Sequence, residues 1–175
     1  AATIDRISHG RFGINVVCGW FTPEMEMFGV QQLPHDDRYA RATEWITVCK
    51  RLWQEQDFDY TGEYYRVRGG YLLPKPVQQP YPLLINAGVS PAGIDYAARE
   101  MDVNFSIVQT PDQGRELIDH IRAKAAGYGR DLGIMTSAAV VCRSSEAEAR
   151  AVWDHIVARG DYAALDNLLT TFGVQ

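Results

Sequence analysis

The stretch PLLINAGVSPAGIDYAARE, residues 82–100, contains a strand followed directly by a helix. Its first half is an apolar run that ends in small residues, which predicts a buried strand. Ser90 follows as a helix N-cap with Pro91 at the first helical position, which predicts a helix over the remaining residues. This stretch is typical of one βα unit in a parallel sheet.

The same alternation continues towards the end of the chain. Strands are expected at residues 103–107 and 136–142, and helices at about 112–128 and 146–159. Residues 161–171 have room for one more helix. This order of strand and helix is the sequence sign of a parallel sheet.

The chain before residue 82 adds another unit. After the end of a helix at residues 1–7, a buried strand is expected at 11–18, and a short acidic helix with Thr22 as N-cap at 23–28. A longer helix should begin near Asp36 or Asp37, either of which could cap it. Its apolar residues recur at spacings of three and four and form one face, namely Ala42, Trp45, Ile46, Cys49, Leu52 and Trp53.

An excursion separates these units. Residues 58–68 alternate around a Thr-Gly pair, which predicts a hairpin, and four prolines at 74–82 predict an extended connection. Four βα units are half of an eightfold barrel, and an open half would expose two strand edges. We therefore expect an α/β fold, a partial (β/α)8 TIM barrel with a hairpin insertion. The missing initiator Met also suggests a fragment.

The composition favours a small-molecule partner. The 175 residues are 46% hydrophobic and 22% charged, with a net charge of -5, which is typical of one globular domain. Neither Lys nor Arg forms a dense stripe, so nucleic acid and anionic membranes are not expected partners. The three cysteines have no metal-ligand spacing, and no apolar stretch approaches a membrane span of about 20 residues. These features predict a cytoplasmic protein with no metal site.

Polar residues gather around the end of the first strand. Asn15 lies among apolar neighbours, so it is either a buried amide bonded to a neighbouring strand or an amide facing the barrel mouth. Glu24 is either a surface carboxylate favoured by the helix dipole or a site residue just beyond a strand end.

Two further elements could bind an anion. Arg38 and Tyr39 in HDDRY supply a guanidinium and a phenol, which suit a phosphate or an anionic oxygen. Ser90 either caps its helix or helps the helix N-terminus to hold a phosphate. No Ser/His/Asp arrangement, metal motif or paired carboxylates are evident, so an organic cofactor is the better candidate.

Several strings occur together in one known family. Over about residues 3–107 the chain resembles the bacterial-luciferase-like flavin monooxygenases, through IDRISHGRFGINVVCGW, PEMEMFG, HDDRYARATEW, FDYTGEYY and PKPVQQPYPLLINAGVSPAG. The most similar branch contains the pyrimidine, dimethyl sulfone and alkanesulfonate monooxygenases, while residues 108–175 fit more loosely. The resemblance implies a (β/α)8 barrel about twice this length, of which residues 1–175 would form part of one domain, approximately strands four to seven.

The resemblance also implies a reaction and a set of ligands. The family uses reduced FMN (FMNH2) from a separate NAD(P)H-dependent flavin reductase, and transfers one oxygen atom from O2 to a small substrate. A small sulfone or alkanesulfonate is favoured here over a pyrimidine-like cyclic amide, and a homo-oligomer is expected. By position, the flavin-binding residues would be Asn15, Glu24, Arg38, Tyr39 and Ser90, while Cys18 stands where a relative has Thr.

Two other interpretations remain open. A deazaflavin (F420)-dependent oxidoreductase could use the same barrel for hydride transfer, and a difference spectrum with each cofactor would distinguish it. A non-catalytic barrel fragment acting as a packing or dimerisation module would bind no flavin at all.

Overall fold

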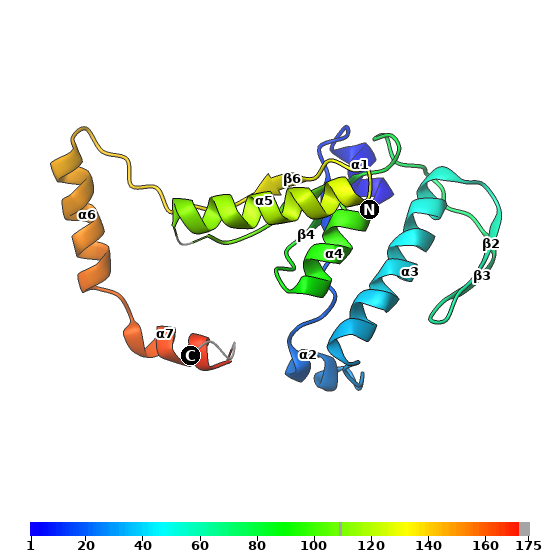
Figure 1. Cartoon of the computed structure of the whole chain (residues 1–175), viewed down its shortest axis with the longest axis horizontal. Coiled ribbons are helices and arrows are strands. Elements are labelled where there is room, and N and C mark those ends of the chain that lie inside the picture. Colours follow the sequence, from blue (N-terminus) through cyan, green and yellow to red (C-terminus); the bar gives the residue numbers. More distant parts are fainter. Residues whose placement is uncertain (109, 172–175) are drawn as a thin grey trace. The chain divides into compact units, whose positions relative to one another are not determined.

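The computed structural model describes residues 1–108 and 110–171 (Figure 1). The chain divides into two compact units, Ala1–Thr136 and Ser137–Gln175, which are described separately. The first unit contains a parallel sheet, a hairpin and the cleft described below. The prediction that residues 1–175 belong to one barrel domain stays a prediction.

The sheet of the first unit has four parallel strands in the spatial order β1-β4-β5-β6. These strands are β1 (Gly13–Asn15), β4 (Leu83–Asn86), β5 (Val103–Phe105) and β6 (Gly133–Met135). Asn15 pairs with Ile85, and Asn86 pairs with Asn104. Spatial order follows chain order, as it does when helices connect successive parallel strands. The predicted α/β fold with a parallel sheet is confirmed.

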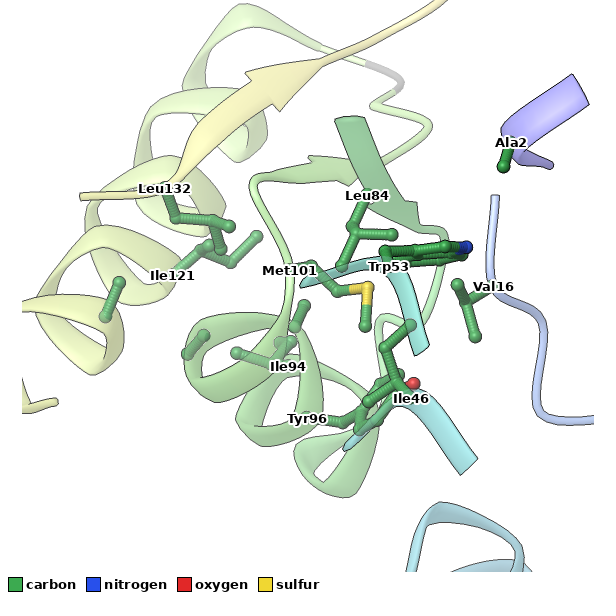
Figure 2. Packing of buried hydrophobic residues seen from close by; sticks show 13 residues of the cluster. Ala2, Val16, Ile46, Trp53, Leu84, Ile94, Tyr96, Met101, Ile121 and Leu132 are labelled. Atoms are coloured by element: carbon green, nitrogen blue, oxygen red, sulfur yellow. The ribbon is translucent and has the colours of Figure 1, made fainter. Parts of the chain in front are cut away.

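Helices accompany these strands. They are α1 (Ala2–Ile7), α2 (Thr22–Met27), α3 (His35–Gln54), α4 (Pro91–Glu100) and α5 (Pro111–Gly127). Helix α4 packs against both α3 and α5. The core lies between these helices and the sheet (Figure 2), and its largest buried residues include Ile46, Trp53, Leu84, Tyr96, Met101 and Ile121.

The predicted hairpin consists of β2 (Phe58–Thr61) and β3 (Arg66–Gly70). Its turn is attached to α3 by a single side chain. The Glu44 carboxylate accepts hydrogen bonds from the backbone N–H groups of Glu63, Tyr64 and Tyr65, at 2.7, 3.0 and 3.1 Å. The proline-rich connection after it contains no helix or strand, as expected.

A buried carboxylate attaches α1 to the proline-rich connection. Asp5 accepts hydrogen bonds from the backbone N–H groups of Val77 and Gln78, at 2.6 and 3.0 Å, and from the Gln78 side chain at 2.6 Å. The same side chain donates to the Phe12 carbonyl just before β1. Burial raises the pKa of the Asp5 carboxyl, but these hydrogen bonds outweigh burial and hold the pKa below its ordinary value of 3.8.

Several predicted boundaries are wrong. The strand expected at 136–142 lies earlier, at β6, because Leu132 is buried there and β6 pairs with β5, whereas Val140 is 81% exposed. Phe21 rather than Thr22 is the N-cap of α2. Pro34 precedes the first turn of α3, so Asp36 and Asp37 lie inside that turn and cap nothing.

The second unit contains the helices α6 (Glu146–Ala158) and α7 (Tyr162–Thr171), close to their predicted positions. The Ser145 hydroxyl caps α6 by accepting a hydrogen bond from the Glu148 N–H at 3.3 Å. Over residues 1–108 and 110–171, none of the helices combines the length and the apolar character needed to cross a membrane.

Candidate functional site

A cleft of about 440 Å³ lies at the carboxyl ends of β1 and β4. Parallel α/β sheets bind their ligands at this edge. The end of β1, the first turns of α3 and the turn after β4 all contribute to its wall. The lining residues are Asn15, Val17, Cys18, Gly19, Trp20, His35, Arg38, Tyr39, Asn86, Ala87 and Gly88.

Asn15 is the last residue of β1 and is exposed to this cleft. Within the described residues, its side-chain amide has no hydrogen-bond partner. The interpretation of Asn15 as a buried amide bonded to a neighbouring strand is therefore wrong. Its amide instead offers one acceptor and two donors to a ligand.

Arg38 and Tyr39 reach the cleft from α3. The Arg38 Nη1 donates to the Gly19 carbonyl, while its Nε is buried without a hydrogen-bond partner among the described residues. A buried unpaired donor is costly, about 1–3 kcal/mol. The Tyr39 hydroxyl lies against the turn after β4, where a Cβ on Gly88 would stand 2.9 Å from it.

Ser90 caps α4, as predicted, and its hydroxyl accepts a hydrogen bond from the Gly93 N–H at 3.1 Å. The same oxygen lies 3.2 Å from the His35 Nε2, and the His35 Nδ1 lies 2.7 Å from the Asp36 carboxylate. The first turns of α3 and α4 thus bring a Ser, a His and an Asp together. The sequence analysis found no Ser/His/Asp arrangement, since Ser90 and His35 are 55 residues apart and meet only in the folded chain.

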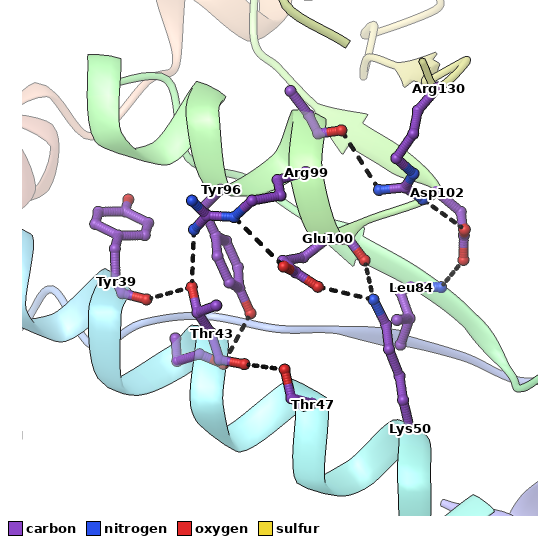
Figure 3. A network of polar contacts seen from close by, with 12 residues as sticks. Tyr39, Thr43, Thr47, Lys50, Leu84, Tyr96, Arg99, Glu100, Asp102 and Arg130 are labelled. Carbon is purple, nitrogen blue, oxygen red and sulfur yellow. Dashed lines mark hydrogen bonds and ion pairs between the residues drawn. The ribbon is translucent and has the colours of Figure 1, made fainter. Parts of the chain in front are cut away.

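A polar network outside the cleft fixes α3 relative to α4 and the sheet (Figure 3). Lys50 of α3 pairs with Glu100 of α4 at 3.0 Å, and the Arg99 guanidinium donates to the Thr43 hydroxyl at 3.0 Å. Because these pairs join the two helices, the α3 side chains stay opposite the N-terminus of α4.

The structure brings together Asn15, Arg38 and Tyr39 in one cleft and connects Ser90 to it through His35. Glu24 lies elsewhere, exposed in the first turn of α2 and outside the cleft lining. Its role at a flavin stays a prediction.

Sequence reasoning missed two buried asparagines that hold the turn after β4, Asn86 and Asn104. Asn86 and Asn104 end or nearly end their strands, and each bonds to the turn after β4. The signal was available, because an Asn inside an apolar strand is the same pattern that drew attention to Asn15.

Cys18 lines the cleft as a half-buried thiol. Burial raises the pKa of this thiol to about 11, against the opposing effect of the positive charges on Arg38 and Arg41. At neutral pH the side chain is therefore a protonated, weakly polar group.

The model of the family described as luciferase-like monooxygenase matches residues 1–172. The chain belongs to this family. It is 39% identical over 165 residues to an FMNH2-dependent dimethylsulfone monooxygenase of Pseudomonas putida, covering 94% of this chain and 46% of the relative. It is 37% identical over 172 residues to a pyrimidine monooxygenase of Cronobacter sakazakii, covering 94% of this chain and 50% of the relative.

A solved structure of a long-chain alkane monooxygenase is similar with a TM-score of 0.81 and 25% identity, covering 87% of this chain and 41% of that one. The chain spans about half the length of the curated relatives it matches. The expected resemblance and the partial TIM-barrel fold are confirmed. The assignment to strands four to seven stays a prediction.

Proposed function

We propose that the protein is an FMNH2-dependent monooxygenase that inserts one oxygen atom from O2 into a small organosulfur substrate, such as a sulfone or an alkanesulfonate. A pyrimidine-like cyclic amide is the second substrate class to test. The observation that carries the proposal is the cleft at the strand ends, where a free amide, a guanidinium and a phenol converge. The similarity to the FMNH2-dependent dimethylsulfone monooxygenase supports it.

We propose that residues of α3 and the start of α4 hold the phosphate of FMN. The Tyr39 hydroxyl supplies a donor, and Arg38 supplies a positive charge. Ser90 and the N-terminus of α4 add a hydroxyl and the positive end of a helix dipole. A phosphate dianion could accept a hydrogen bond from the Tyr39 hydroxyl.

We propose that residues at and just after the end of β1 face the flavin ring. Asn15 can hydrogen-bond to ring nitrogens and carbonyl oxygens, because its amide carries both donors and an acceptor. Val17, Cys18 and Trp20 supply largely apolar surface against which the ring can pack. We propose that Glu24 approaches the ring from α2, although it lies outside the cleft lining.

When bound, reduced flavin supplies the electrons that activate O2 for transfer of one oxygen atom. The chain's own residues bind, orient and shield the cofactor. Arg38, Tyr39 and Ser90 hold the phosphate, Asn15 sets the orientation of the ring, and the apolar wall excludes water from the reacting face.

We further propose that a separate flavin reductase, using NAD(P)H, delivers the reduced FMN. This protein would act as a homo-oligomer in the cytoplasm. The chain described here contributes the wall of the site that carries Asn15 and Arg38.

The decisive experiment is an anaerobic titration of the full-length protein with reduced FMN. We expect saturable binding that Arg38→Met weakens at least about tenfold, because the substitution removes a charged donor. Arg122→Met is the matched control, since Arg122 is exposed on α5 and lies outside the cleft lining. A protein that binds no reduced FMN would rule the proposal out.

The reaction is tested with a flavin reductase, NADH and ¹⁸O₂. We expect one labelled oxygen atom in the products formed from dimethyl sulfone or from an alkanesulfonate. Uracil is the comparison substrate for the pyrimidine class. The same titration decides the alternatives. Selective binding of F420 would indicate hydride transfer, and a folded protein that binds neither cofactor would indicate a packing module.

A further inference from the structure

Gly88 follows β4 and is held by two side-chain amides from different strands. The Asn86 Oδ1 accepts a hydrogen bond from the Gly88 N–H at 2.8 Å, and the Asn104 Nδ2 donates to the Gly88 carbonyl at 3.1 Å. Both asparagines are buried, at 2% and 0% exposure. The two peptide planes that flank Gly88 are therefore each fixed by one amide.

The orientation of Asn104 is itself determined by a neighbour. The buried hydroxyl of Ser106 donates to the Asn104 Oδ1. Because that oxygen accepts the Ser106 proton, the Asn104 Nδ2 must face the Gly88 carbonyl. A polar chain thus runs from Ser106 in the sheet layer to the turn that precedes α4.

The turn has no spare room for movement towards the sheet. A Cβ on Gly88 would stand 2.8 Å from the Asn86 Oδ1, 2.8 Å from the Gly93 Cα and 2.9 Å from the Tyr39 hydroxyl. The turn is therefore packed between the asparagine below it, α4 beside it and the cleft residue Tyr39.

The peptide geometry connects this turn to the cleft. A trans peptide places its N–H opposite its C=O, so the Val89 N–H points away from Asn104 when Asn104 holds the Gly88 carbonyl. The next residue is Ser90, whose hydroxyl and helix face His35 at the cleft. Rotation of the Gly88–Val89 peptide would displace these groups.

We propose that Asn104 is a positioning residue for the flavin phosphate. It orients the turn at 87–90 so that Ser90 and the start of α4 meet a phosphate ester, with Ser106 setting its orientation. This inference rests on the proposed flavin site. It makes a distinct claim, because Asn104 does not line the cleft and acts only through the turn.

The test compares FMN with riboflavin, which lacks only the phosphate. In the full-length protein, Asn104→Leu keeps the side-chain size but leaves the Gly88 carbonyl without its donor. We expect the Kd for FMN to rise about tenfold while the Kd for riboflavin changes by less than about twofold, which corresponds to losing one well-placed hydrogen bond at the phosphate end. Anaerobic titrations with each flavin in its reduced form, followed by quenching of the protein's tryptophan fluorescence, measure both constants.

Two variants separate positioning from general damage. Ser106→Ala removes only the hydroxyl that orients Asn104, and it should reduce the FMN preference about threefold. Gln78→Leu is the control, because Gln78 bonds to Asp5 and Phe12 before β1 rather than to the turn. It should lower stability and leave the FMN-to-riboflavin ratio unchanged.

The outcomes are distinguishable. If the wild-type protein binds neither flavin, the proposed function fails. If it prefers FMN and Asn104→Leu keeps that preference, the positioning role fails while the flavin site stands. Should Asn104→Leu not fold, Ser106→Ala decides, and an unchanged ratio in that variant overturns the inference.

Discussion

The ends of β1 and β4 carry the same residue type in opposite situations. Asn15 is exposed to the cleft and has no partner among the described residues, whereas Asn86 is 2% exposed and makes two hydrogen bonds. Strand β4 lies between β1 and β5, while β1 pairs only with β4 in the described sheet. An asparagine at a strand end is thus a ligand candidate or a structural clamp according to its neighbours.

The largest expected loss of stability is at the end of β4, where Asn86 holds the backbone. Asn86→Leu removes the donor to the Val16 carbonyl and the acceptor for the Gly88 N–H. Two polar backbone groups then lose their partners, so we expect the free energy of unfolding to fall by about 3 kcal/mol. Urea unfolding of the full-length protein measures this loss, and a loss below about 1 kcal/mol would contradict the clamp.

The packing of the clamped turn gives the next effect. Gly88→Ala places a Cβ within 3.0 Å of three atoms, including the Gly93 Cα, and should cost about 2 kcal/mol. Gly127→Ala is the matched control, since nothing lies within 4 Å of a Cβ at that position. In thermal unfolding, Gly127→Ala should therefore have a higher midpoint temperature than Gly88→Ala.

The start of β1 contrasts with its open end, because Asp5 and Gln78 hold the residues before it. The pKa of Asp5 is lowered on folding, so its carboxylate stabilises the fold above pH 3.8 and this contribution is lost as the pH falls through the lower folded pKa. Asp5→Asn should be less stable than wild type at pH 7. The difference between their urea midpoints should shrink at pH 3, and an unchanged difference would contradict this.

The N-cap of α4, Ser90, follows the turn after β4, and its substitution tests the helix side of that turn. Ser90→Ala removes the hydroxyl that accepts the Gly93 N–H and should cost about 1 kcal/mol of stability. It should also weaken FMN more than riboflavin, because Ser90 is proposed at the phosphate. Ser145→Ala is a control cap in the second unit, and it should leave flavin binding unchanged.

The smallest loss of stability is expected at the end of β1, where Asn15 makes no hydrogen bond within the described residues. Asn15→Leu breaks no hydrogen bond in the described structure, so its unfolding free energy should stay within about 0.5 kcal/mol of wild type. Both FMN and riboflavin should nevertheless bind more weakly, since Asn15 is proposed at the ring. A large loss of stability would show that Asn15 is a clamp like Asn86.

The strand and helix order was predictable because each βα unit carries its own local signals. Ser90 and Pro91 predict the start of α4, and the spacing of apolar residues predicts α3. The last strand was misplaced because 138–142 is rich in apolar residues, while β6 is decided by its pairing with β5. That pairing depends on residues distant in the sequence.

The candidate site was predictable in part for the same reason. Arg38, Tyr39 and Ser90 belong to recognisable strings. Of the predicted residues, Asn15, Arg38 and Tyr39 line one cleft. The contact between His35 and Ser90 and the support from Asn104 arise only when α3, β4 and β5 are assembled. No local sequence pattern shows that Asn15 lacks a hydrogen-bond partner in the described structure while Asn86 has two.

The protonated state of Cys18 determines how readily the thiol in the cleft wall could be oxidised. With a pKa of about 11, only about one thiol in ten thousand is a thiolate at pH 7. Oxidation to sulfenic acid proceeds through the thiolate. If the cleft holds reduced flavin as proposed, a protonated Cys18 would react only slowly with the oxidants formed beside it.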